Sequence, residues 1–387
     1  MTEDQPLGRG HVPALDGLRA FAILLVCAHN FDILAGNLSA PAKGLALAMD
    51  AGWIGVQLFF VLSGYLITGG LLDTRAADNY FGTFFGRRLV RIFPLYYVVL
   101  LVGVVLVPLV LRQALPAHQI WLWTYTSNWA QPSGRVVDTF PHFWSLAVEE
   151  QFYLVWPFVV RLLPPKRLVV TSLVLGAVAL AFRIYFVKTS DSPERAYMYT
   201  VCRMDALCFG AAIAAVVRDP AWSARVRRWG GRAGWAALGL AVVSAGVTRG
   251  FPRISPIGQT AGYTLLTLIF GLLLVFAITR GAEPRGAART ILGARALGVI
   301  GKYSYAIYVF HQPFHVFVGK PLLARLGYAE GTTNPLVALG YVTLASAVSV
   351  GLGFVSFHVL EKHFLRMKRY FVASKGPARA AEGEAPA

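Results

Sequence analysis

The residues of this chain that could carry chemistry are ionisable side chains set inside long apolar runs. In LDGLRAFAILLVCAHNF, residues 15–31, His29 follows Arg19 by ten positions, which along a helix is about 15 Å. A neutral imidazole is the best general base near pH 7, and the guanidinium of Arg19 could stabilise negative charge on a reacting carbonyl. Two structural roles remain open: Arg19 as an interfacial anchor, and His29 bonded to a neighbouring helix.

A cluster of arginines stands in FFGRRLVRIFPLYY, residues 84–97. Arg88 and Arg91 are three positions apart, so they share a helix face and could hold a phosphate or pyrophosphate together with Arg87. Pro94 suits the first turn of a helix that begins there. The alternative interpretation is that these cations only mark the cytoplasmic end of a membrane helix.

The segment PHFWSLAVEEQFYLVWPF, residues 141–158, is the richest in polar side chains. His142, Ser145 and Glu149 recur at helical spacing and therefore lie on one stripe. Such a stripe, extended by Trp144 and Tyr153, could hold a hydrogen-bonded network around a sugar hydroxyl. A structural network between helices remains possible.

Two later segments carry further candidates, CRMDALCFG at 202–210 and GKYSYAIYVFHQPF at 301–314. Neither charge of Arg203 and Asp205 would be tolerated alone in an apolar run, so we predict that they form an ion pair with a structural role. The second segment presents hydroxyls and an imidazole for an acceptor or supporting network, with Tyr308 and His311 on one face. Its members are Ser304, Tyr305, Tyr308 and His311.

The segment GWIGVQLFFVLSGYLIT, residues 52–68, contains Ser63 between apolar residues and Gly64. Small residues allow neighbouring membrane helices to approach closely. No general base stands beside Ser63 in the sequence. We therefore favour packing over nucleophilic catalysis at this position.

The elements that position these residues must be membrane helices. Of the 387 residues 56% are hydrophobic and 14% charged, whereas a soluble protein carries about 25% charged residues. Apolar stretches near the required length of about 20 residues predict an all-α bundle of ten spans, with residues 118–130 as an interfacial or re-entrant segment. The predicted spans are 13–33, 53–72, 94–112, 142–161, 168–187, 200–217, 233–248, 259–279, 298–318 and 335–359.

The charge pattern orients the bundle. The net charge is +17, but Lys and Arg fall in short clusters between spans, which excludes nucleic acid as a partner and is typical of membrane topology. Most of them lie in alternate loops, so both termini are predicted in the cytoplasm. We expect a transmembrane domain over residues 1–369 and a disordered cytoplasmic tail over 370–387, rich in Ala, Gly, Pro and Glu.

These segments together resemble acyltransferase family 3, integral-membrane enzymes that modify extracytoplasmic glycans. The matching pieces are LDGLR with His29, GVQLFFVLSGYLI, RRLVRIFPLYY, HFWSLAVEEQFY, RMDALCFG and SYAIYVFH, in the family's order over residues 11–361. The resemblance implies ten helices in a bacterial cytoplasmic membrane, acyl-CoA (usually acetyl-CoA) as donor, no metal, and a carbohydrate or glycolipid hydroxyl as acceptor. It also implies an essential Arg19–His29 pair, an RxxR motif at Arg88 and Arg91, and a site at Glu149.

Two departures from the family pattern bear on this interpretation. Nine residues separate Arg19 from His29 here, where the family has ten, so His29 is turned about 80° from the face of Arg19 and Asn30 takes the in-phase position. An appended extracytoplasmic domain, present in many relatives, is not seen, so we expect a stand-alone transferase or one with a separate extracytoplasmic partner protein. The alternative function is a transporter or flippase for a glycan-related or acylated substrate.

Overall fold

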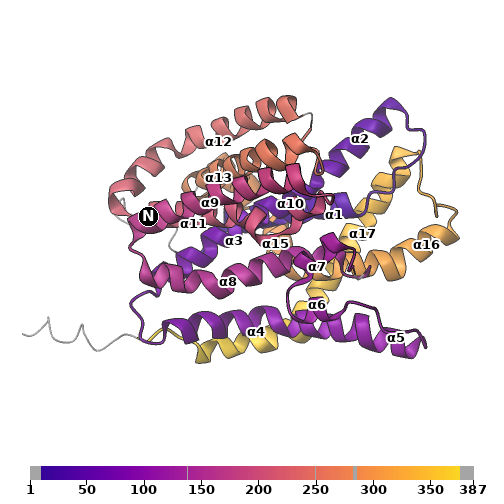
Figure 1. Cartoon of the computed structure of the whole chain (residues 1–387), viewed down its shortest axis with the longest axis horizontal. Helices are drawn as coiled ribbons and strands as arrows, with labels where there is room; N and C mark the ends of the chain where they lie inside the picture. The colour runs from indigo at the N-terminus through magenta and orange to yellow at the C-terminus, as the bar shows by residue number, and fades with distance from the viewer. Residues whose placement is uncertain (1–9, 137, 249, 282–285, 375–387) are drawn as a thin grey trace, which may run out of the picture.

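The computed structural model describes residues 10–136, 138–248, 250–281 and 286–374, which Figure 1 shows as one bundle of helices. Throughout these residues the regular structure is helical, apart from an isolated bridge between Leu34 and Thr332. The predicted all-α fold is therefore confirmed. The predicted tail lies outside the described residues from position 375 onward.

Six helices within the described part of the chain are long and apolar enough to cross a membrane. They are Ala40–Asp73, Tyr80–Val110, Pro165–Thr189, Glu194–Arg218, Gly258–Arg280 and Pro335–Tyr370. The other four predicted spans also fall on helices, namely α1 (Pro13–Asn30), α8 (Trp144–Leu162), α12 (Pro220–Thr248) and α15 (Arg295–Phe314). The chain is thus a multi-pass membrane protein, while ten crossings and cytoplasmic termini remain predictions.

The six long helices are built from several of the elements below, and the others connect them. The remaining α-helices are α2 (Ala40–Asp50), α3 (Ile54–Asp73), α4 (Tyr80–Leu100), α5 (Val107–Val110), α6 (Ile120–Trp123), α7 (Ser127–Ala130), α9 (Pro165–Thr189), α10 (Glu194–Met198), α11 (Thr200–Arg218), α13 (Tyr263–Arg280), α14 (Ala287–Leu292), α16 (Lys320–Arg325), α17 (Pro335–Ser356) and α18 (Lys362–Arg366). Tight 3₁₀ turns cover Ala51–Trp53, Gln131–Ser133, Pro141–Phe143 and Met367–Tyr370, and π-helical segments cover Leu101–Leu106, Gly258–Gly262, His315–Gly319 and Phe357–Glu361.

Helix α3 packs against α1, α8, α11 and α13. Its sequence is apolar on every side, as expected for a helix that is surrounded by others. A Cβ atom on Gly64 would meet the Leu207 carbonyl of α11, and one on Gly210 would meet the Val61 carbonyl of α3. This close approach agrees with the packing predicted for Gly64, and it fixes the position of the neighbouring Ser63.

One predicted helix boundary is wrong where it matters most. Helix α4 begins at Tyr80, so Arg87, Arg88 and Arg91 lie inside it, and Pro94 stands in its interior rather than its first turn. Arginine side chains can extend along a helix to reach a polar region. For that reason a basic segment can continue a membrane helix instead of ending it.

Two other segments at the edges of the bundle also differ from, or refine, the prediction. Helix α12 begins at Pro220, well before the predicted start at 233, and it lies on the opposite edge of the bundle from α4 (Figure 1). The segment 118–130 forms the short helices α6 and α7. Tyr96 of α4 holds it in place by donating a hydrogen bond to the Leu122 carbonyl at 2.8 Å.

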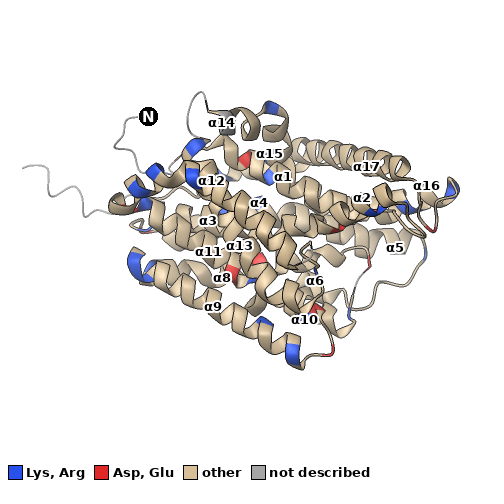
Figure 2. Cartoon of the chain, turned by 90° about the horizontal axis from the view of Figure 1, so that it is seen from above, with Lys and Arg blue, Asp and Glu red and all other residues tan. Residues whose placement is uncertain are grey.

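Several Lys and Arg residues mark the end of the bundle at which the N-terminus lies, as Figure 2 shows. The start of the predicted tail docks at this end. Asn79 Nδ2 donates to the Val372 carbonyl at 2.8 Å, and Asn79 Oδ1 accepts from the backbone N–H of Ser374 at 2.9 Å. Residues 371–374 therefore lie against the beginning of α4.

Candidate active site

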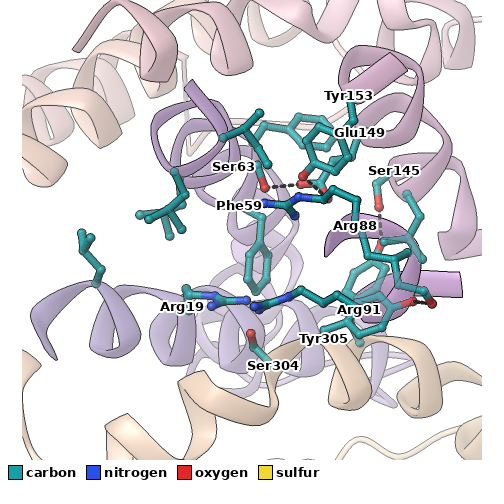
Figure 3. Close-up of a pocket in the computed structure, with 18 of the residues that line it drawn as sticks. Arg19, Phe59, Ser63, Arg88, Arg91, Ser145, Glu149, Tyr153, Ser304 and Tyr305 are labelled. Atoms are coloured by element: carbon teal, nitrogen blue, oxygen red, sulfur yellow. Dashed lines mark hydrogen bonds between the residues drawn. The ribbon is translucent and has the colours of Figure 1, made fainter. Parts of the chain in front are cut away.

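A cavity of about 350 Å³ lies between α1, α3, α4, α8 and α15 (Figure 3). Gly10, His11 and Val12 line it together with polar residues from all five helices. The cavity is therefore at the N-terminal end of α1, the end for which the charge pattern predicts the cytoplasm. The predicted candidates that line it are Arg19, Arg88, Arg91, Ser145, Glu149, Tyr153, Ser304, Tyr305 and Tyr308.

Three guanidinium groups enter this cavity. Arg88 and Arg91 come from one face of α4, as their spacing predicts, and Arg19 comes from α1. Among the described residues none of the three has an ion-pair or hydrogen-bond partner in the protein; the Arg88 guanidinium carbon lies 5.0 Å from the centre of the Tyr153 ring. Such a group of unpaired cations can bind an anion with charge-assisted hydrogen bonds.

Arg87, the third arginine of the predicted donor-binding set, does not line the cavity. It is exposed on α4, and its Nε donates to the Phe371 carbonyl at 2.7 Å. Because α4 is helical here, Arg87 points about 100° away from Arg88. The third arginine that lines the cavity is Arg19, which precedes Arg88 by 69 positions in the sequence.

A carboxylate and a hydroxyl face the same cavity. Ser63 Oγ of α3 donates to Glu149 Oε1 of α8 at 2.6 Å, and the Tyr153 hydroxyl donates to Glu149 Oε2 at 3.2 Å. The sequence predicted Glu149 and Tyr153 but not Ser63. Ser63 is separated from its carboxylate by 86 residues, so nothing in its own segment could reveal the pair.

On the wall of the cavity formed by α8 and α15, two hydroxyls are hydrogen-bonded to each other. Ser145 Oγ and Tyr308 Oη lie 2.6 Å apart, and Tyr308 Oη donates to the His142 carbonyl at 2.8 Å. Tyr305 donates its hydroxyl to the Ile92 carbonyl at 2.8 Å. The structure thus brings the predicted α8 and α15 residues together.

His142 and His311 lie behind that wall, outside the residues that line the cavity. Both are buried, and their ring centres are 4.7 Å apart. His311 Nδ1 bonds the Tyr308 carbonyl at 2.6 Å, whereas His311 Nε2 and both ring nitrogens of His142 have no partner among the described residues. These nitrogens could exchange protons with a bound molecule or water.

His29 does not face the cavity either. It lies near the end of α1, about 15 Å along the helix from Arg19, with Nδ1 3.7 Å from Asp50 Oδ1. Asn30, next to it, accepts a hydrogen bond from Gln312 of α15. His29 therefore contacts α2 and Asn30 contacts α15, which agrees with the offset of His29 from the face of Arg19. In the loop beyond, burial raises the pKa of Asp32 above its ordinary value.

The predicted ion pair between Arg203 and Asp205 is wrong. Asp205 Oδ2 instead accepts from Arg183 at 2.8 Å, and Arg203 donates to Gln57 Oε1 at 2.6 Å. Residues two apart on a helix point in different directions, which is why Asp205 turns to α9. Arg203 packs against aromatic rings that include Trp144, 5.8 Å from its guanidinium carbon, and neither residue lines the cavity.

Over the described ranges, no three His, Cys, Asp or Glu side chains are grouped so that they could hold a metal ion. The cavity combines three arginines with the carboxylates of Asp16, Glu149 and Glu150, with His11 and with several hydroxyls, of which Ser63 is bonded to Glu149. This set can bind a phosphorylated molecule and activate an alcohol.

Comparison with known proteins gives a consistent picture. A family model described as an acyltransferase domain matches residues 12–354. The O-acetyltransferase OatA of Staphylococcus aureus is 27% identical over 338 residues, covering 80% of this chain and 51% of that protein. The peptidoglycan O-acetyltransferase OatA of Listeria monocytogenes is 31% identical over 324 residues, covering 79% and 49%. The chain therefore spans about half the length of these curated relatives, and no solved structure matches it.

Proposed function

The chain belongs to the acyltransferase family whose model spans residues 12–354, and from this premise we propose that it is a membrane O-acyltransferase. It moves an acyl group, acetyl in the first instance, from cytoplasmic acyl-CoA to a hydroxyl of a carbohydrate or glycolipid on the other side of a bacterial cytoplasmic membrane. Peptidoglycan, which the name of the Listeria relative gives as its acceptor, is the first acceptor to test.

The observation that carries this proposal is the group of unpaired arginines. A partly buried cation without a partner is costly, so Arg19, Arg88 and Arg91, each partly buried, would be retained for a ligand that neutralises them. Coenzyme A carries phosphates, which arginine binds through paired hydrogen bonds. The cavity also holds Glu149 and several hydroxyls, which could act on the thioester beside those phosphates.

The acceptor is assigned to the other end of α1. His29 is half-buried and has Asp50 beside it, so it could take the proton of an alcohol and be oriented by the carboxylate. About 15 Å of helix separates it from Arg19. In this scheme donor and acceptor approach from opposite ends, and Ser145, Tyr308, His142 and His311 lie between them.

The test is transfer of radiolabelled acetyl from acetyl-CoA to peptidoglycan fragments by the purified chain in lipid nanodiscs. We expect release of coenzyme A together with labelled glycan. A His29→Ala variant should keep its elution profile and melting temperature but lose transfer by about 100-fold or more. Exposed His363, changed to Ala, is the matched control and should retain transfer.

Two results would contradict the proposal. One is full transfer by His29→Ala, which would remove the histidine from the mechanism. The other is an active preparation that moves a glycan or lipid across the bilayer without releasing coenzyme A, which would favour a transporter. Transfer is read in nanodiscs, and movement across the bilayer is read from the same protein in sealed liposomes, because a nanodisc encloses no compartment.

A further inference from the structure

The carboxylate–hydroxyl pair of the cavity has the geometry of an activated nucleophile. Ser63 Oγ donates to Glu149 Oε1 at 2.6 Å, within the reach expected for a nucleophile and its base. The Tyr153 hydroxyl bonds the other carboxylate oxygen at 3.2 Å and holds its orientation. A nucleophile, a base and a group that orients the base therefore stand in line on the cavity wall.

Several hydroxyls elsewhere in these helices bond back to their own helix, and Ser356, which donates to a carboxylate, meets a residue only five positions away, Glu361. Ser349 donates to the Ala345 carbonyl of its own helix at 2.8 Å, and Thr267 donates to the Tyr263 carbonyl at 3.0 Å. This back-bonding is the usual way for a hydroxyl to be satisfied inside a helix. Ser63 instead donates across the bundle to an acidic side chain, and both partners line a cavity.

The cations are divided between two places around this pair. Figure 3 shows Arg88 reaching toward Ser63 and Glu149, while Arg19 and Arg91 lie together on the other side of Phe59. A guanidinium beside the nucleophile can stabilise the oxyanion that forms when a carbonyl is attacked. Two neighbouring guanidiniums can hold the phosphates of the donor.

On this geometry, and resting on the proposed function, we infer that Ser63 is a catalytic nucleophile that carries the acyl group as an ester. Ser63 Oγ attacks the thioester carbonyl of acyl-CoA while Glu149 accepts its proton. The C–S bond breaks, the ester C–O bond forms, and the proton passes from Glu149 to the sulfur so that coenzyme A leaves as the thiol. Arg88 stabilises the intermediate oxyanion.

The second half-reaction returns the serine. A hydroxyl attacks the ester carbonyl from the side where Ser145 and Tyr308 line the cavity. Its proton goes to Glu149 and then to Ser63 Oγ, as the ester C–O bond to the serine breaks. In this two-step scheme the acceptor enters from the His29 end of α1, about 15 Å from Arg19, and its hydroxyl reaches into the cavity. His29 then positions the acceptor, and Glu149 takes its proton.

The experiment looks for the ester directly. The full chain in nanodiscs is mixed with isotope-labelled acetyl-CoA without acceptor, quenched in acid and digested for mass spectrometry. We expect one labelled acetyl group on the peptide that contains Ser63. Changing Ser63 to Cys should place a thioester at the same position, since Cys27, Cys202 and Cys208 are buried and should stay unlabelled.

Variants separate a nucleophile from a structural hydroxyl. Ser63→Ala should abolish the adduct and lower transfer by at least about 100-fold. Glu149→Gln should slow acylation by about 100-fold while coenzyme A binds as tightly as before or more tightly, because a negative charge has left the cavity. Ser349→Ala, which removes a hydroxyl away from the cavity, should leave acylation and transfer unchanged.

The inference and the proposed function can fail separately. If the wild-type chain releases coenzyme A and labels the glycan, but Ser63→Ala does so within about threefold of it, Ser63 is not a nucleophile and the acyltransferase assignment stands. Acetyl found on another residue would likewise overturn the inference. If the wild-type chain releases no coenzyme A even with acceptor present, the proposed function itself is wrong.

Discussion

Two groups of arginines lie inside this bundle, and they are treated in opposite ways. Arg183 donates to Asp205 at 2.8 Å, to the Cys202 carbonyl at 2.7 Å and to Thr264 at 2.7 Å, and it is 0% exposed. Arg88 and Arg91 of α4 have no such partner in the described chain and face a cavity.

The difference teaches how to separate structure from function among buried charges. A cation that meets a carboxylate and two oxygens needs nothing else, so the α9–α11 pair joins helices. The cavity arginines share their cavity with Asp16, Glu149 and Glu150 but form no ion pair with them in the described chain. Their hydrogen-bond donors are therefore free for an anion from outside the protein. Arg203 lies between the two groups: one nitrogen donates to Gln57 and aromatic rings surround the guanidinium, but its Nε and Nη1 have no hydrogen-bond partner among the described residues.

The largest effect should come from breaking the partnered group. Asp205→Ala would leave Arg183 buried without its carboxylate, which costs about 3–5 kcal/mol of unfolding free energy. Equilibrium unfolding in mixed micelles measures this loss. Glu194→Ala is the matched control, since its pair with Arg253 is partly exposed at 3.3 Å and should cost about 1 kcal/mol or less. Equal losses for the two variants would contradict the comparison.

The next largest effect should come from removing an unpaired cation. Arg91→Ala should weaken coenzyme A binding by about 10- to 100-fold, the equivalent of one charged hydrogen-bond set, with no loss of unfolding free energy. Titration calorimetry gives the first quantity and micelle unfolding the second. Arg167→Gln removes an exposed charge near the start of α9 and should do neither. Destabilisation by Arg91→Ala would place this residue in the structural group.

The comparison also shows what could be read from the sequence. Arg88, Arg91, Ser145 and Glu149 were predicted because helical periodicity places them on common faces, and the structure brings them into one cavity. Periodicity describes only one helix at a time. It therefore paired Arg203 with the nearby Asp205, although the true partner of Asp205 is on α9.

Boundaries and long-range pairs were beyond that reasoning. The sequence predicted that a helix begins at Pro94, after a loop that carries the arginines. In the structure α4 includes both the arginines and Pro94. Ser63 was assigned to packing because its carboxylate stands 86 residues away. Such a contact depends on how α3 and α8 cross, which local sequence does not encode.

A smaller effect should follow from giving the unpaired cations a partner. Ser304 lines the cavity, and its Oγ has no hydrogen bond among the described residues; Figure 3 shows it beside Arg19. Ser304→Asp would place a carboxylate where an anionic ligand is proposed to bind. We expect coenzyme A affinity to fall about tenfold and the melting temperature to stay or rise.

Ser304→Asn is the control for that variant, because it has nearly the same size without the charge. It should change affinity much less than Asp does. If Asn and Asp weaken binding equally, the loss reflects crowding in the cavity. That result would show that the arginines do not bind an anionic ligand beside Ser304.

The smallest effect should come from Arg87, which stands next to Arg88 but outside the cavity. Its Nε already donates to the Phe371 carbonyl, so it can attract an anionic donor only through solvent, where charges are screened beyond about 8–10 Å at physiological salt. Arg87→Ala should therefore raise the KM for acetyl-CoA by only about two- to threefold at low salt, and the difference should vanish at high salt. Arg88→Ala, measured beside it, should lose far more activity at either salt concentration. A loss of activity in Arg87→Ala that is independent of salt and as large as that of Arg88→Ala would show that the donor contacts both arginines. Arg87 would then belong to the donor-binding group of α4.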